Sequence, residues 1–356
     1  IEPKCPKCSG KGVLYIPTHE VAGFKLVPTN IMECTVNGFK TDMDTAIKHI
    51  TETNATAKDF LQSYTRYSAI RTYLRTFIEG IERGLDVNNF IHPQFMQCVT
   101  ATGRLSSRNP NFQNMPRGST FPVRKAIVSR FNNGFILEGD YRQLEFRVAG
   151  FLSKDKQLYR DVKNDVDVHQ YTADTMGVER QDAKAHTFKP LYGGVLGTPK
   201  EMRYYEAFKH KYWQVTNWHD KLQREAVETK KIKLPSGREY SFPYARYTQY
   251  GNVTNSTAIK NYPVQGFATA DLLPLALVNL YAIMKKKNMK SVICNTVHDS
   301  IILDVHPEEK IECIDCLRNA MMSIKDECNS RYNIDYDMPV DIELKIGDNW
   351  LETKEI

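Results

Sequence analysis

Two aspartates follow short apolar runs that have the pattern of strands. Asp140 comes after Phe135–Leu137, and Asp299 comes after Val292–Val297. If the fold places these strand ends side by side, the two carboxylates can hold two Mg²⁺ ions. Such ions lower the pKa of an attacking hydroxyl and hold a leaving pyrophosphate, which is phosphoryl-transfer chemistry. A single aspartate after a strand is ordinarily a cap or turn residue, so the prediction depends on the pair.

A second group recurs at helical spacing. Arg180, Lys184, Phe188 and Tyr192 are four residues apart and are predicted to share one helix face. Two cations one turn apart can neutralise a triphosphate, and the aromatic residue one turn further on can stack on a base or sugar. Taken alone, the pattern also fits a solvated basic face with two core aromatic residues.

A polar loop carries a third group of candidates. The segment TATGRLSSRNPNFQNMP (100–116) is rich in hydrogen-bond donors, and its Arg104 and Arg108 could reach phosphates or a minor groove. By itself the segment could equally be a plain polar loop.

These segments, taken in order with others, resemble the family A DNA polymerases. The shared segments are TATGRLSSRNPNFQNMP (100–116), DYRQLEFR (140–147), RQDAKAHTFKPLYGG (180–194), NYPVQG (261–266) and VHDS (297–300). The similarity spans roughly residues 40–356 and includes Asn349-Trp350. The chain looks most like bacteriophage-type members related to bacterial DNA polymerase I.

The resemblance implies an α+β right-hand polymerase fold. Its parts would be an antiparallel-sheet palm, helical fingers and a partial helical thumb. Residues 1–95 would form the partial thumb with a cysteine-containing N-terminal insertion, and 151–250 the fingers. Residues 96–150 and 251–356 would form the palm.

The resemblance also implies catalytic roles. Asp140, Asp299 and the backbone carbonyl of Tyr141 would be ligands of two Mg²⁺ ions. Lys184 would hold the triphosphate with Arg180 and protonate the pyrophosphate.

Further residues would contact the incoming deoxynucleotide, the primer or the template. Phe188 would stack on the nucleotide, Tyr192 would pack beside the nascent pair, His169 would contact phosphate, and Glu145 would exclude a ribose 2′-hydroxyl. Primer, template and nucleotide would also be positioned by Gln143, Arg104, Asn261, Gln265 and His298.

The sequence departs from the family pattern at three places. Ser300 stands where many relatives carry Glu, so a third acidic group near the metals is missing. Lys189-Pro190 replaces a Gly-containing pair, and a proline inside a helix removes a hydrogen bond and kinks it. Thr257 stands where some relatives have an arginine that touches the template.

Composition sets outer limits on the function. The 356 residues include 48 Lys and Arg against 42 Asp and Glu, a formal charge of +6 that mildly favours a polyanionic partner. No run of eighteen apolar residues and no signal-peptide pattern occurs, so no membrane partner is expected and the expected location is the cytoplasm, that of the host cell if a phage encodes the chain. The chain starts at Ile1, so a proofreading domain is expected before it or in a separate protein, as is a processivity partner.

The eight cysteines include one CxxC pair. Cys5 and Cys8 are followed by Ser-Gly-Lys-Gly, which looks like half of a zinc knuckle that His19 and Cys34 could complete. A tight turn in a hairpin is the alternative, and a chaperone-type zinc module is set aside because the unit occurs once. Cys313 and Cys316 lie in a helical pattern and are predicted to pack in the core.

The elements that must position these residues alternate between helices and hairpins without βαβ units, which is typical of the α+β class. The helices are expected over 59–83, within 155–230, over 265–285 and at about 308–330. A turn is expected at 234–238, a hairpin over 292–303 with His298-Asp299 at its turn, and a strand near 340–345.

Two rival functions remain open on the sequence. A single-subunit RNA polymerase shares the metal acids and the Arg/Lys helix, but it normally lacks the equivalents of Glu145 and Phe188. A degenerate, non-catalytic primer-template DNA-binding module would keep the groove, although all catalytic positions are intact here. Phe188 further predicts poor use of dideoxynucleotides.

Overall fold

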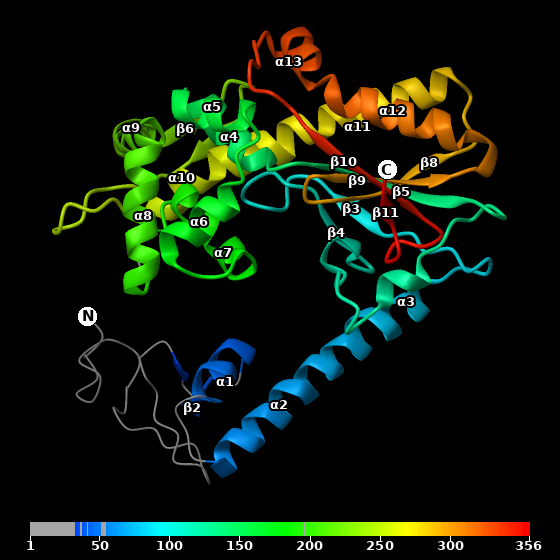
Figure 1. Ribbon diagram of the computed structural model, residues 1–356, viewed down its shortest axis with the longest axis horizontal. Coiled ribbons are helices and arrows are strands. Elements are labelled where there is room, and N and C mark those ends of the chain that lie inside the picture. The colour runs from blue at the N-terminus through cyan, green and yellow to red at the C-terminus, as the bar shows by residue number, and fades with distance from the viewer. Residues whose placement is uncertain (1–32, 36–37, 41, 51–54, 195–196) are drawn as a thin grey trace, which may run out of the picture. The chain divides into compact units, whose positions relative to one another are not determined.

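The computed structural model describes residues 33–35, 38–40, 42–50, 55–194 and 197–356 (Figure 1). The chain divides into two compact units, Ile1–Ile91 and His92–Ile356. Helices and antiparallel sheets occur together, so the expected α+β class is confirmed.

The first unit is mainly helical where it is described. Its elements are β1 (Cys34–Thr35), β2 (Gly38–Phe39), α1 (Met43–Ile50), α2 (Ala55–Tyr73), the π-helical segment η2 (Leu74–Ile78) and α3 (Glu79–Gly84). The last three form one continuous helix, so the helix expected over 59–83 is confirmed. It begins at Ala55, four residues before the expected start. Ala57 and Leu61 of this helix pack on Ala46 of α1.

A five-stranded antiparallel sheet forms the centre of the second unit, in the order β11-β10-β5-β9-β8. The strands are β5 (Phe135–Tyr141), β8 (Val292–Val297), β9 (Ser300–Val305), β10 (Ile342–Gly347) and β11 (Lys354–Glu355). All six residues of β9 are buried, because strands flank it on both sides and other elements cover the sheet. Figure 1 shows α11 (Leu273–Lys286) and α12 (Lys310–Met322) running across one face of the sheet, and α12 contacts β5 and β10.

A group of helices follows β5 and packs beside the sheet (Figure 1). The group consists of α4 (Leu144–Ser153), α5 (Lys156–Lys163), α6 (Val168–Met176), α7 (Arg180–Thr187), α8 (Pro199–Lys211) and α9 (Trp213–Thr229). One core runs through sheet and helices, from Leu137 through Phe146 to Val215. Asp155 starts α5 by accepting a hydrogen bond from the Leu158 backbone N–H at 2.8 Å, which satisfies an otherwise free donor of the first turn.

One long helix links this group to the sheet. It comprises α10 (Ser256–Gln265), the π-helical segment η6 (Gly266–Leu272) and α11. Pro274 follows directly after η6 inside this long helix, and because proline has no N–H, one helical hydrogen bond is missing at the junction of η6 and α11. By length and composition, Ser256–Lys286 could cross a membrane, and 56% of its apolar window is buried inside the protein. Phe267, Leu272 and Leu280 lie in the core, so burial accounts for the apolar character.

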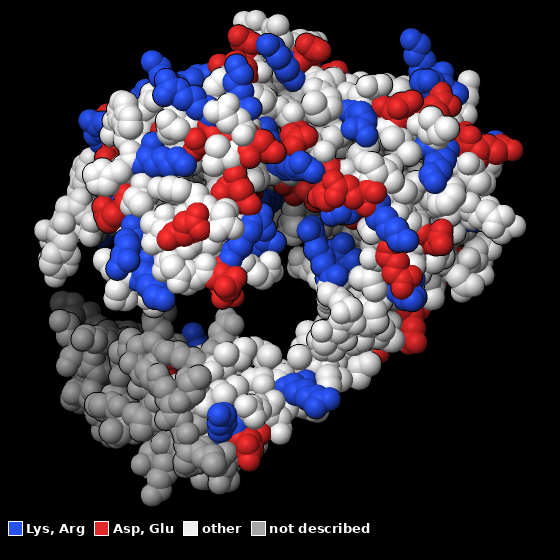
Figure 2. All heavy atoms as spheres, viewed as in Figure 1, with Lys and Arg blue, Asp and Glu red and all other residues white. Residues whose placement is uncertain are grey.

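The remaining short elements connect these layers. They are β3 (Gln94–Met96), β4 (Ser106–Arg108), η3 (Phe112–Asn114), η4 (Val123–Ala126), η5 (Pro190–Tyr192), β6 (Lys231–Lys233), β7 (Glu239–Ser241) and η7 (Pro307–Glu309). Strands β6 and β7 pair around 234–238, which confirms the expected turn. Figure 2 shows Lys and Arg intermixed with Asp and Glu over the visible face of this unit, as their spread in the sequence suggested.

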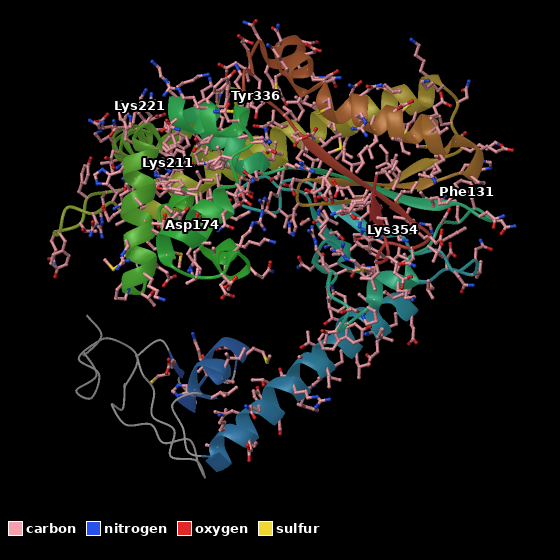
Figure 3. All side chains as sticks on the ribbon, in the orientation of Figure 1. Phe131, Asp174, Lys211, Lys221, Tyr336 and Lys354 are labelled. Carbon is pink, nitrogen blue, oxygen red and sulfur yellow. The ribbon has the colours of Figure 1, made fainter. Side chains whose placement is uncertain are left out.

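The expectation of one helix at about 308–330 is wrong in one respect, because two helices occupy this segment. The chain forms α12 and then a separate α13 (Ile324–Tyr332), with the break at Ser323. The Ser323 hydroxyl donates to the Ala320 carbonyl and accepts from the Asn279 side chain at 2.8 Å, which draws the chain toward α11. Beyond α13, Tyr336 (labelled in Figure 3) lies 4.8 Å from the Phe151 ring and anchors the return to β10.

Candidate active site

The structure brings Asp140 and Asp299 together. Asp140 lies opposite Ser300 in the register of β5 and β9, and Asp299 is the residue just before β9. The Tyr141 N–H donates to the Asp299 carbonyl at 3.3 Å, which fixes the hairpin turn against β5. His298, the other turn residue, takes the left-handed conformation with φ of 56°. The hairpin with His298-Asp299 at its turn is therefore confirmed.

Both carboxyls are held in a poorly solvated place. Burial raises the pKa of Asp140, and the negative charge of Asp299 raises it further. Burial also raises the pKa of Asp299, with a smaller contribution from the charge of Glu145. Within the described residues, neither carboxylate forms an ion pair with a Lys or Arg. The site therefore concentrates negative charge that is costly without a cation.

This donor set fits Mg²⁺. The ion prefers oxygen ligands and commonly uses one or two carboxylates together with water and substrate phosphates. Asp140, Asp299 and the Tyr141 carbonyl are such donors, while the Tyr141 ring is buried and its hydroxyl donates to the Met321 carbonyl at 2.8 Å. In the described parts of the chain, no group of three or more His, Cys, Asp or Glu could hold a metal ion, so substrate and water would have to complete the coordination.

Glu145 lies beside the acid pair in the first turn of α4. Its carboxylate forms an ion pair with Arg104, whose Nε also donates to the Thr269 hydroxyl at 2.9 Å. Burial raises the pKa of Glu145 and the Arg104 charge opposes that rise. Two residues with separate expected roles, sugar selection and primer contact, thus form one unit tied to η6. Gln143, directly before α4, has a left-handed backbone with φ of 53°.

A cationic group forms around α7. Arg180 and Lys184 lie on α7, and both positive charges act on His169 of α6. The His169 ring meets the Phe188 ring edge-on at 5.4 Å, and its Nδ1 lies 3.0 Å from the Thr187 hydroxyl. Burial lowers the pKa of His169, which keeps the ring neutral beside these cations. Arg180 is held by Asp167 at 2.7 Å.

The expectation that Tyr192 shares the face of α7 is wrong. Helix α7 ends at Thr187 with Phe188 as its cap, and Tyr192 belongs to the separate 3-10 turn η5. Pro190 has no N–H to continue the helix and begins that turn instead. Tyr192 remains half-buried against the core.

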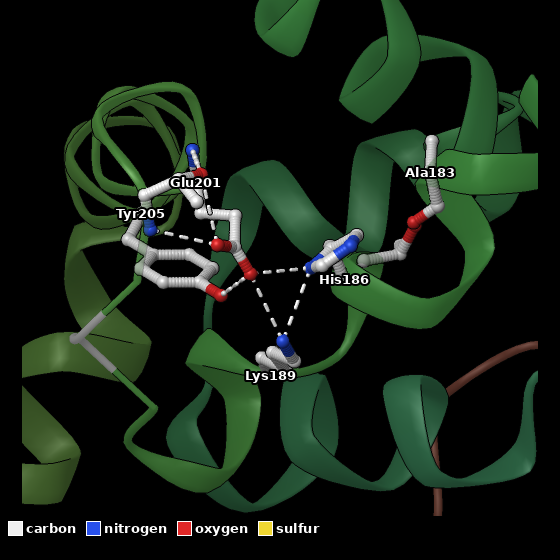
Figure 4. Close-up of polar contacts among 7 residues, drawn as sticks. Ala183, His186, Lys189, Glu201 and Tyr205 are labelled. Carbon is white, nitrogen blue, oxygen red and sulfur yellow. Dashed lines mark hydrogen bonds and ion pairs between the residues drawn. The ribbon is translucent and has the colours of Figure 1, made fainter. Parts of the chain in front are cut away.

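Lys189, one of the departures from the family pattern, has a structural partner. Figure 4 shows Lys189 and His186 converging on Glu201 of α8, at 3.0 and 2.7 Å. Glu201 also closes a capping box with Thr198, and the Tyr205 hydroxyl donates to it at 3.3 Å. The backbone N–H of Thr198 and the Lys189 ammonium together lower the pKa of Glu201 to about 2. We call this network the Glu201 latch, and sequence reasoning missed it.

The residues expected to position primer and template lie on α10, in the turn between β8 and β9 and in the loop between β3 and β4. Asn261 and Gln265 lie on α10, and the Asn261 Oδ1 is buried and has no hydrogen-bond partner among the residues that the structure describes. His298 and Arg104 line a cavity of about 230 Å³ together with Thr269 and Gln113. Burial lowers the pKa of His298, and neighbouring arginines lower it further.

Arg117 was not predicted as a site residue. Its positive charge opposes the rise in the pKa of both Asp140 and Asp299 and lowers that of His298, so its exposed side chain lies near all three. The only signal in the sequence is an arginine directly after Asn-Met-Pro116.

The cysteines divide into two groups. Cys5, Cys8 and His19 lie outside the described residues, so the zinc expectation stays a prediction, and Cys34 is a free, half-buried thiol. Cys313 and Cys316 are buried on α12, which confirms that they pack in the core.

Comparisons with known proteins show the family of this chain. The family model described as "DNA polymerase family A" matches residues 25–352. The chain is similar to DNA polymerase I of Lactococcus lactis, at 31% identity over 88% of this chain and 37% of that protein. It is similar to thermostable DNA polymerase I of Thermus aquaticus, at 32% identity over 74% of this chain and 33% of that protein.

A solved structure supports the fold. The POL domain of Pol1 from M. smegmatis, in complex with DNA primer-template and dNTP, superposes with a TM-score of 0.76 at 24% identity. The superposition covers 90% of this chain and 57% of the chain of the solved structure. The chain spans little more than a third of the length of the bacterial relatives it matches. Because these relatives are bacterial proteins, the bacteriophage type stays a prediction. Because the family model spans most of the sequence, the chain belongs to DNA polymerase family A.

Proposed function

We propose that this chain is a template-directed DNA polymerase that adds deoxynucleotides to a primer 3′-hydroxyl, by two-metal phosphoryl transfer, in DNA replication. The observation that carries the proposal is the half-buried acid pair: Asp140 lies on β5, Asp299 lies directly before the neighbouring β9, and neither forms an ion pair with a described Lys or Arg. The names of the bacterial relatives and the DNA and dNTP bound to the structural neighbour support it.

The acid pair and the Tyr141 carbonyl would hold two Mg²⁺ ions. When bound, the ions would activate the primer hydroxyl and neutralise the leaving pyrophosphate. The chain's own contribution is to fix the two carboxylates through the register of β5 and β9 and to keep the site poorly solvated.

The cations of α7 would bind the triphosphate. Arg180 would exchange its ion pair with Asp167 for phosphate oxygens. The triphosphate charge would favour the protonated form of His169, which can donate from Nε2 while its Nδ1–H donates to the Thr187 hydroxyl. Lys184 Nζ would donate a proton to the departing pyrophosphate. Phe188, wedged between His169 and Phe146, presents a fixed ring on which the nucleotide would stack.

Glu145 would exclude ribonucleotides by occupying the place of a 2′-hydroxyl. Arg104 and Thr269 hold it there. Tyr192 would pack beside the nascent pair, and Gln143, Asn261, Gln265 and His298 would position primer and template.

The finer assignments are part of the same proposal. The thumb (1–95), palm (96–150 and 251–356) and fingers (151–250) and the bacteriophage type rest on the motif resemblance. So do a separate proofreading or processivity protein, a cytoplasmic location and zinc at Cys5 and Cys8.

The test is primer extension on a primed DNA template with Mg²⁺, comparing dNTPs with rNTPs. We expect extension with dNTPs that follows the template when its sequence is changed. Binding of primed DNA without extension would favour the degenerate binding module, and a preference for rNTPs would favour RNA synthesis.

A further inference from the structure

A hairpin that projects from the second unit carries three exposed tyrosines. It lies between β7 and α10 and is the yellow-green protrusion at the left of Figure 1. Tyr244, Tyr247 and Tyr250 are 82%, 53% and 81% exposed. The tip of this protrusion is drawn white in Figure 2, in keeping with residues 247–252, which include no charged side chain, and the exposed Arg246 directly precedes them. Exposed aromatic groups at this density mark a binding surface more often than chance.

The hairpin is hydrogen-bonded rather than a loose loop. Tyr247 pairs with Val253, and the Thr248 N–H donates to the Asn252 carbonyl at 2.7 Å. Ala245 and Val253 are buried in the main core, and the Lys230 ammonium donates to the Ala245 carbonyl. The backbone thus fixes the base of the hairpin while the tyrosines point away from the core. Rings held in this way lose little conformational entropy on binding.

A groove of about 680 Å³ opens at the foot of the hairpin. Its lining includes Tyr247 and Val253 of the hairpin, Asp220 and Arg224 of α9, and Lys260 of α10. The Ser256 hydroxyl donates to the Gln223 side chain at 2.8 Å, which ties α10 to α9 next to the groove. All of these residues belong to the second unit.

The groove also reaches the turn that holds Tyr192. Gly193 lines the groove and caps η5, the turn in which Tyr192 is the last residue. Gly193 has φ of 78°, and a Cβ there would collide with the Lys260 side chain, so the lysine stem lies directly on this turn. Burial lowers the pKa of Lys260, while the Asp220 carboxylate raises it. One end of the groove therefore starts next to a residue already assigned to the nascent pair.

We propose that the tyrosine hairpin and its groove bind single-stranded nucleic acid, namely the unpaired template ahead of the nascent pair. This inference rests on the proposed polymerase function. Bases would stack on Tyr244, Tyr247 and Tyr250, and the phosphates would lie toward Arg224 and Lys260. The charged side chains that line the groove are two cations, Arg224 and Lys260, and one carboxylate, Asp220, so the groove keeps a net positive charge. Positive charge beside exposed aromatic rings is the combination that binds single strands without sequence preference. A purely apolar protein partner would leave these two cations without a role.

The experiment measures the affinity of the 356-residue chain for a fluorescent single-stranded oligonucleotide of about ten nucleotides, within the span of such sites. The same measurement is made for primed templates with a one-nucleotide or a long 5′ overhang. The variants are Y244A, Y247A and Y250A, alone and combined, matched by Y244F, Y247F and Y250F. Thermal unfolding confirms that each variant is folded.

We expect the combined Ala variant to lose affinity for the oligonucleotide and the long overhang by about five- to a hundredfold, because each stacked base contributes substantially. The combined Phe variant should retain the affinity, since its rings remain. The short-overhang substrate should bind the parent and all variants alike. Equal affinity of the Ala variant and the parent for the long overhang would overturn the inference, as would an equal loss on both overhangs.

Primer extension separates this inference from the proposed function. Extension by the parent without any tyrosine-dependent binding of single strands would overturn the inference alone. Tyrosine-dependent binding of single strands without extension would instead count against the polymerase function.

Discussion

The acid pair and the cations of α7 lie in two regions that are held in place by different interactions: backbone hydrogen bonds of a sheet in the first and side-chain contacts in the second. Asp140 and Asp299 are fixed by backbone hydrogen bonds of a buried sheet, and their place follows from strand register. Arg180 and Lys184 are exposed on an eight-residue helix whose position depends on side-chain contacts. A sheet is suited to holding metal ligands at a fixed separation, whereas a helix held by side chains can move when a triphosphate binds.

The contacts that hold α7 gather near its C-terminal end. Thr187 accepts a hydrogen bond at its carbonyl from the Tyr204 hydroxyl at 2.7 Å, and the Glu201 latch holds His186 and Lys189. At the N-terminal end, Arg180 meets only Asp167 among the described residues in an ion pair. Side-chain contacts therefore fix the C-terminal end of α7, next to Phe188. At the N-terminal end, Arg180 could exchange its ion pair with Asp167 for a triphosphate.

The largest effect on the helix side is expected from Lys184→Ala. The variant removes the proposed proton donor, and general acid catalysis contributes about 10²- to 10⁴-fold, so kcat should fall by that order. Lys184→Arg, which keeps the charge, should retain nucleotide affinity but not the proton transfer. Single-turnover extension measures both. A Lys184→Ala enzyme with normal kcat and raised KM would show that the residue only binds.

Glu145→Ala tests the residue that lies between the two regions. Removing the carboxylate should admit a 2′-hydroxyl, and relief of a steric clash of about 1–3 kcal/mol corresponds to a gain in ribonucleotide use of roughly five- to 150-fold. The ratio of kcat/KM for dNTP and rNTP measures it. Arg104→Lys serves as a control that keeps a charge beside Glu145 while losing the fork that reaches Thr269. Unchanged sugar selectivity in Glu145→Ala would contradict the assignment.

Phe188→Tyr should change dideoxynucleotide use by a smaller factor. A ring hydroxyl can replace the missing 3′-hydroxyl contact, and one such hydrogen bond contributes about 1 kcal/mol, or several-fold in incorporation. Competition between a dNTP and its dideoxy analogue gives the ratio. No change would mean that the ring does not face the sugar as proposed.

Glu201→Gln should affect stability more than chemistry. Losing the charged partner of Lys189 and His186 and weakening the capping box should cost about 1–2 kcal/mol of the free energy of unfolding. The pKa of Glu201 is lowered from 4.5 to about 2, so its contribution is complete above pH 4.5 and is lost as pH falls toward 2. The gap in stability between parent and variant should therefore shrink over that range. A gap independent of pH would show that the charge of Glu201 is not what stabilises the latch.

Local patterns predicted the parts of the site that depend on short stretches of chain. Apolar runs around His298-Asp299 predicted the hairpin, and the run before Asp140 predicted β5. The resemblance then implied that Asp140 and Asp299 lie close together, because it assigns both to one metal site. Pairings between distant residues could not be predicted in this way. Arg104 and Glu145 are 41 positions apart and Arg104 and Thr269 are 165 apart, and no spacing rule connects them.

Tyr192 shows the limit of periodicity. Spacing by four placed it on α7, but Pro190 ends hydrogen bonding of the α type and starts η5. The exposure of Tyr244, Tyr247 and Tyr250 could not be predicted from the sequence either, because composition does not tell which face of a hairpin meets the core.

The most direct test of the account is single-turnover primer extension by Asp140→Asn and Asp299→Asn beside Asp304→Asn. Asp304 lies on β9, the strand that Asp299 directly precedes. Its carboxylate pairs with Arg130 at 2.6 Å and accepts a hydrogen bond from the Ser129 hydroxyl, so it is a matched structural carboxylate. We predict that the first two variants bind primed DNA and fail to extend it, while Asp304→Asn extends at a rate near that of the parent. Extension by either Asp140→Asn or Asp299→Asn at the parent's rate would contradict the two-metal account.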